Sequence, residues 1–168
     1  MACRTGAGCA GRGIAHLPRA RPTGRFAGGS IQSGGAAAVI ECKTGRLATH
    51  AAQAARDHWA LAGTWLEVER AEYRLAMSWL QAGDAAQACR QAQACLDGVS
   101  ANEGPALELF YACEAMARSL VALGDRPGAA HATAQADEAF AALAPDDRAA
   151  CEASLQVLRS MTAAVPPD

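Results

Sequence analysis

The chain has 168 residues, enough for one domain with a tail, and its formal net charge of −2 is close to neutral. Hydrophobic residues make up 51% of it and aromatic residues 5%, with alanine supplying much of the apolar content. Since alanine is the best helix former and β-branched residues are sparse after residue 50, this composition favours an all-α fold and argues against a sheet.

Charge is divided unevenly along the chain. Residues 1–46 contain seven basic residues and one acid, whereas residues 47–168 contain eight arginines and sixteen acids. Binding to a nucleic-acid backbone needs clustered positive charge, so we expect no nucleic-acid partner except through the basic tail. No apolar run approaches the roughly 18 residues of a membrane span, and the first residues lack the apolar core of a secretory signal. We therefore expect a cytoplasmic protein that does not enter a membrane, although the Arg-rich start also bears some similarity to an organelle transit peptide.

The seven cysteines include no C-x-x-C pair. Four of them fall within predicted helices, mostly on apolar faces, where free cysteine packs as a small hydrophobe: Cys89, Cys95, Cys113 and Cys151. No pair has the spacing of zinc ligands, and the histidines are scattered. We expect reduced thiols in the core, no bound metal and no cofactor.

Residues 1–45 are rich in glycine, alanine and arginine, and Pro18 and Pro22 interrupt any helix. This composition predicts a disordered or weakly ordered basic tail. A helical domain is then expected over residues 46–162, followed by a frayed end at 163–168. The first helix is predicted from one face of three-and-four spacing that ends at Gly63: Leu47, Ala51, Ala54, Ala55, His58, Trp59 and Ala62.

The following helices are predicted from their end signals. Thr64 and Glu67 form a capping box that starts a second helix, which runs to about Ala82. Gly83 supplies a left-handed stop, and Asp84 caps a third helix that is expected to end at Gly98.

Three more helices complete the domain. Pro105 suits the first turn of a fourth helix, whose apolar stripe runs from Leu109 to Leu123. Asp125 and Pro127 open a fifth helix, and Pro145 precedes a sixth, which makes about six helices in all.

Two helix–Gly-Asp–helix units share a pattern of large and small residues. The first has Leu75, Ala76, Trp79, Gly83, Asp84, Ala88 and Cys95, and the second has Met116, Ala117, Leu120, Gly124, Asp125, Ala129 and Ala136. This pattern resembles the tetratricopeptide repeat, although the step from Gly83 to Gly124 is longer than that family's period. The resemblance implies antiparallel helix pairs stacked as a short α-α superhelix.

In that family, ligands lie against the concave face made by the first helix of each pair. The resemblance places six partner-binding residues on this face: Arg70, Tyr73, Met77, Tyr111, Glu114 and Arg118. The alternative is that the tyrosines are packing residues and that Glu114 and Arg118 form an i,i+4 surface pair. The lysine-containing clamp that some of these repeats use to grip a C-terminal carboxylate is not expected, since lysine is absent after residue 46.

Catalytic chemistry is not indicated. The helical histidines are isolated, and no glycine-rich stretch continues into a phosphate loop. Glu67, Glu69 and Glu72 are interpreted as a solvated helix face. We therefore expect a non-enzymatic adaptor that binds a protein or peptide. A helical-repeat part of a signalling or transcription regulator, and a small secretion-type chaperone, are the alternative hypotheses. An end helix with exposed apolar residues would also allow two copies to form a homodimer.

Overall fold

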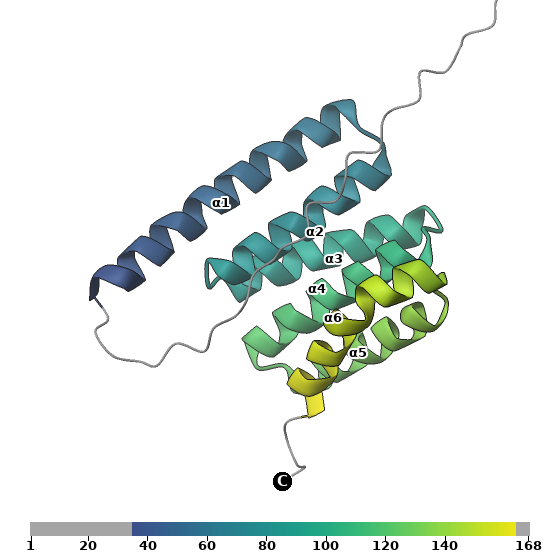
Figure 1. Ribbon diagram of the computed structural model, residues 1–168. Helices are drawn as coiled ribbons and strands as arrows, with labels where there is room; N and C mark the ends of the chain where they lie inside the picture. The colour runs from purple at the N-terminus through teal and green to yellow at the C-terminus, as the bar shows by residue number, and fades with distance from the viewer. Residues whose placement is uncertain (1–34, 164–168) are drawn as a thin grey trace, which may run out of the picture. The chain divides into compact units, whose positions relative to one another are not determined.

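The computed structural model describes residues 35–163 of the chain, and side chains from residue 45 onward. Within this range the chain forms six α-helices and no strand, which confirms the predicted all-α fold (Figure 1). Of the tail predicted over residues 1–45, residues 1–34 lie outside the described residues, as do the last five residues of the chain. The helices are α1 (Gly35–Ala62), α2 (Trp65–Gln81), α3 (Ala85–Ala101), α4 (Ala106–Leu123), α5 (Arg126–Ala141) and α6 (Pro145–Ala163).

Side chains and glycines that act locally define most of the helix ends. The amide of Thr64 donates to Glu67 Oε2 (2.8 Å), and the amide of Leu66 donates to Thr64 Oγ1 (3.3 Å). Asp84 Oδ1 accepts from the amide of Gln87 (2.9 Å), and α2 ends before Gly83, whose φ is +81°. The predicted capping box, left-handed stop and N-cap are therefore confirmed.

Two predicted boundaries are wrong. α1 begins at Gly35 rather than near residue 46, because an alanine-rich run follows Gly35 and no proline interrupts it. α3 continues through Gly98 to Ala101, since one glycine costs a helix only about 1 kcal/mol. Asn102 ends α3 instead, and its Nδ2 donates to the carbonyl of Gly98 (2.8 Å).

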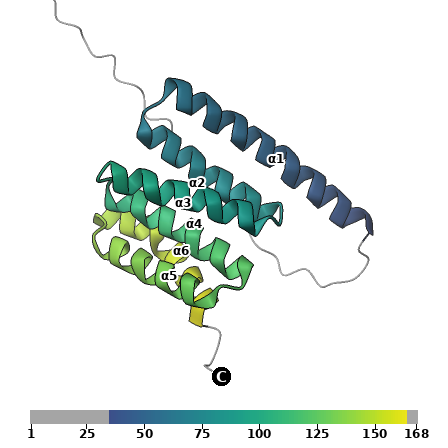
Figure 2. The same cartoon turned by 180° about the vertical axis from the view of Figure 1, so that it is seen from behind.

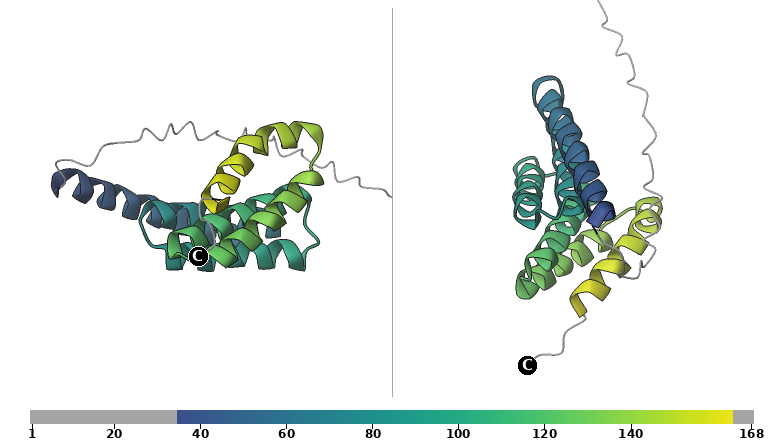
Figure 3. Two further views of the ribbon diagram at one scale, coloured as in Figure 1. Left: turned by 90° about the horizontal axis from the view of Figure 1, so that it is seen from below. Right: turned by 90° about the vertical axis from the view of Figure 1, so that its left-hand side faces the viewer.

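Consecutive helices pack against each other as antiparallel neighbours, as the prediction of helix pairs requires (Figures 1 and 2). In addition, α2 contacts α4 and α4 contacts α6, so the first helices of successive pairs form a row. We call this the α2–α4–α6 row. Both α3 and α6 pack against α4 without contacting each other, and α1 contacts α2 alone among the helices (Figure 3).

Small side chains make this close packing possible. Alanines on every helix from α2 to α5 are fully or almost fully buried, together with a few large residues such as Leu75, Phe110 and Leu155. Small residues at crossing points let two helices approach closely. Cys95, Cys113 and Cys151 are buried and form no disulfide, as predicted, and Cys89 is half-buried. Leu123 departs from the predicted stripe of α4, because it lies in the last turn and is exposed.

Candidate functional site

The six predicted binding residues come from two helices that contact each other. Three of them lie on α2 and three on α4, in each case at spacings of three and four that share one helical face. Because α2 packs against α4, the two sets meet on the α2–α4–α6 row. The candidate site is therefore a feature of the packed helix pairs.

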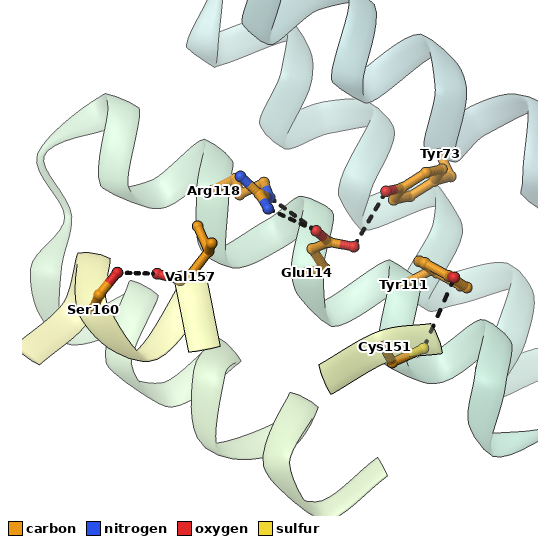
Figure 4. A network of polar contacts seen from close by, with 7 residues as sticks. All are labelled: Tyr73, Tyr111, Glu114, Arg118, Cys151, Val157 and Ser160. Atoms are coloured by element: carbon orange, nitrogen blue, oxygen red, sulfur yellow. Dashed lines mark hydrogen bonds and ion pairs between the residues drawn. The ribbon is translucent and has the colours of Figure 1, made fainter. Parts of the chain in front are cut away.

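Glu114 is the centre of the site. Its carboxylate is buried, with a side-chain exposure of 3%. Arg118 donates to Oε1 through Nε (3.0 Å) and Nη2 (2.8 Å), and Tyr73 donates to Oε2 through its hydroxyl (3.2 Å; Figure 4). The Glu114–Arg118 pair is therefore more than an i,i+4 surface pair, since it anchors a tyrosine of the neighbouring helix.

The two tyrosines connect three helices. Tyr73 and Tyr111 meet edge to face, with ring centroids 5.3 Å apart, an arrangement that favours aromatic pairs. The thiol of Cys151 on α6 donates to the hydroxyl of Tyr111 (3.8 Å; Figure 4). Burial, and then the charge of Glu114, raise the pKa of Tyr73, so its hydroxyl remains a hydrogen-bond donor at neutral pH.

Arg70 and Met77 lie apart from this network. Arg70 pairs instead with Glu108, through Nη2 (2.6 Å) and Nε (3.2 Å), and the carboxylate of Glu108 is buried. Met77 is half-buried on α2 and makes no polar contact with the network. The structure therefore brings together four of the six predicted residues and gives Arg70 a separate ion pair.

Buried acids are the feature that the sequence interpretation missed. Glu69 and Glu72 are buried, so the prediction of a solvated face is wrong for both. The reason is that α1, α3 and α4 all pack around α2 and leave it little solvent-facing surface. Glu72 is paired with Arg56 of α1 (2.6 Å). Glu69, Glu72 and Ala76 follow one another at spacings of three and four residues, so they share one helical face. The small apolar Ala76 on that face was the signal for burial.

The chemistry available among the described residues is limited. No group of three or more His, Cys, Asp or Glu side chains there could hold a metal ion. Burial raises the pKa of Cys113 to about 11 and also raises that of Cys95, so neither thiol supplies a nucleophile near neutral pH. A hollow of about 180 Å³ between the ends of α4, α5 and α6 contains one ionisable side chain, Arg126. Among the described helices, none is both long and apolar enough to cross a membrane.

Comparison with protein-family models, with curated proteins and with solved structures found no match to this chain. The resemblance to tetratricopeptide repeats therefore stays a prediction that depends on the residues quoted above. What the chain does must be argued from its own contacts.

Proposed function

We propose that this chain is a non-enzymatic protein-binding module that holds a partner protein or peptide against the α2–α4–α6 row. The observation that carries the proposal is the fixed position of Arg118 beside two half-buried tyrosines. The cysteines of the described helices form no disulfide, which suits a reducing compartment, and we propose the cytoplasm as the location of the protein.

The side chain of Arg118 is held in place before any ligand binds. Its Nε and Nη2 are held by Glu114, which Tyr73 orients in turn, while Nη1 makes no hydrogen bond within the described residues. The side chain is 21% exposed, and we propose that a ligand oxygen binds at Nη1. A side chain that is already ordered loses less conformational entropy on binding. A backbone carbonyl or a carboxylate of the partner is the group that fits this donor.

Tyr73 and Tyr111 add a rigid surface next to this donor. Tyrosine presents a large apolar ring with a polar tip and has few rotatable bonds, which makes it common in binding surfaces. Both rings are half-buried and held against each other, so they can bind without first being ordered. An extended peptide lying across α2 and α4 would contact both rings.

The test must separate binding from stability, because Arg118 also neutralises Glu114. The Arg118→Lys variant keeps the positive charge but removes the planar donor group. Arg159→Lys is the matched control, since Arg159 forms an ion pair with Asp137 between α6 and α5. The baits for affinity capture would be the unaltered 168-residue chain, the two arginine variants and a Met77→Ala variant. The purified partner would then be titrated against each bait.

We expect the wild type and the Arg159→Lys control to retain the same partner. The Arg118→Lys variant should bind it at least about tenfold more weakly, which corresponds to a loss of about 1.4 kcal/mol. Unfolding curves of each bait would show that the variants remain folded. A partner bound equally by wild type, Arg118→Lys and Met77→Ala would contradict the proposed binding surface.

A further inference from the structure

α1 presents an exposed stripe of two leucines, two alanines and one histidine that no other described helix covers. Leu47 and Leu61 are 71% and 91% exposed, and the three residues between them in the stripe, Ala51, Ala54 and His58, are exposed as well. The successive spacings are four, three, four and three. This is the heptad spacing with which one helix packs along another.

The opposite side of α1 is the side that the fold uses. Gly45 and Thr49 are buried there, and Ala52 and Arg56 are half-buried. A Cβ atom on Gly45 would lie 3.1 Å from Ala82 Cα, so the small residue lets α1 approach the end of α2. Since α1 contacts α2 alone among the described helices, its leucine stripe contributes nothing to the packing of this domain.

We propose that α1 pairs with α1 of a second copy of this chain, in an antiparallel arrangement about a two-fold axis that passes between Ala51 and Ala54. A two-fold interface uses the same surface on both copies, so the stripe must be complementary to itself. In this register Leu47 of one copy lies against His58 and Leu61 of the second copy, and the alanines meet at the centre.

The residues beside the stripe favour this direction. His50 and Asp57 flank it on one side, and the antiparallel register places His50 of each copy beside Asp57 of the other, giving two complementary pairs. Asp57 Oδ1 accepts from Gln53 Nε2 (3.0 Å) and lies 3.6 Å from Arg56 Nη1, which leaves Oδ2 for an imidazole N–H. In a parallel pair the same two residues would instead face the alanines of the other flank, which are Ala48, Ala55 and Ala62. Only the antiparallel pair brings the imidazole beside the carboxylate.

The size of the stripe sets the expected affinity. Residues 45–62 of α1 span about 27 Å at about 1.5 Å per residue. A single helix pair of this length is a small interface, and small interfaces belong to weak or transient complexes. We therefore expect a dissociation constant on the order of tens of micromolar.

Sedimentation equilibrium of the full chain from about 1 to 300 µM tests the proposal. Wild type should convert from monomer to dimer, and the double variant Leu47→Ser, Leu61→Ser should raise the dissociation constant more than about tenfold. The matched control is Leu123→Ser with Val157→Ser, at positions that are 48% and 43% exposed elsewhere in the domain. Its dissociation constant should stay within about twofold of wild type.

The charge pair tests the direction. His50→Asp should weaken the dimer, because it would place two carboxylates together, and adding Asp57→His should restore it by exchanging the partners. Circular dichroism would show that every variant remains folded. The proposal is overturned by a wild type that stays monomeric, by a dimer that ignores the two leucine substitutions, or by a charge exchange that fails to restore association.

Discussion

Replacing Arg118 with alanine gives the sharpest test of the site described above. The substitution leaves the carboxylate of Glu114 buried, with a side-chain exposure of 3%, and removes the cation 2.8 Å from it. At an effective dielectric constant of about 20, two charges at this distance attract by about 6 kcal/mol. This figure is the gross attraction, from which the cost of removing both groups from water must be subtracted.

The net loss should be smaller for two structural reasons. Removing one partner of a fully buried ion pair typically costs about 3–5 kcal/mol. Here the side chain of Arg118 is 21% exposed, so water already screens part of the attraction. The hydroxyl of Tyr73 also continues to donate to Glu114 after the substitution. We therefore expect Arg118→Ala to lower the free energy of unfolding by about 2–3 kcal/mol.

Urea denaturation followed by far-ultraviolet circular dichroism would measure this loss. The control is Arg159→Ala, which breaks an ion pair whose side chains are 55% and 38% exposed. Exposed pairs contribute about 0–1 kcal/mol, so the control should stay within about 1 kcal/mol of wild type. Equal, small losses in the two variants would refute the argument that Glu114 is shielded from water.

Three further predictions concern stability. Leu75→Asp should unfold the domain, because Leu75 is completely buried, whereas Leu61→Asp at a 91% exposed position should leave the urea midpoint of the monomer, at about 1 µM protein, nearly unchanged. Folding raises the pKa of Tyr73. The contribution of this side chain to the free energy of unfolding is therefore complete below about pH 10 and is lost as the pH rises further. The Tyr73→Phe variant should therefore lose stability less steeply than wild type in alkaline urea titrations. Gly98→Ala should raise the thermal midpoint, since the new Cβ would lie 3.9 Å from its nearest neighbour, Glu69 Cβ, and alanine favours the helix. Gly83→Ala should lower the thermal midpoint, because the φ of Gly83 is +81°.

Features that depend on neighbouring residues could be predicted from the sequence. The starts of α2 and α3 follow from Thr64 and Asp84, whose side chains bond to amides two or three residues away. The glycines that follow α2 and α4 have positive φ, a conformation that glycine adopts without strain. The start of α1 at Gly35 and the end of α3 at Ala101 were missed because a single glycine, such as Gly45 or Gly98, is a weak stop, and only the surrounding packing decides whether a helix continues.

The candidate site could be predicted only in part. Helical spacing places Tyr73 with Arg70 on one face of α2, and Glu114 with Arg118 on one face of α4. Which side chains bond across the two helices depends on how α2 and α4 are aligned. That alignment pairs Tyr73 with Glu114, 41 residues along the chain, and sends Arg70 to Glu108 instead.

The sequence by itself determined an all-α chain of helix pairs, because helix propensity, capping and turn chemistry act over a few residues. Only the tertiary structure decided which face of each helix is buried. α1 shows this most clearly: the periodic face from Leu47 to Ala62 predicts the helix, yet the side toward α2 is the one that carries Gly45 and Arg56. The physical reason is that α1 is held by close approach at Gly45 and by the ion pair of Arg56 with Glu72, neither of which contributes to a hydrophobic period.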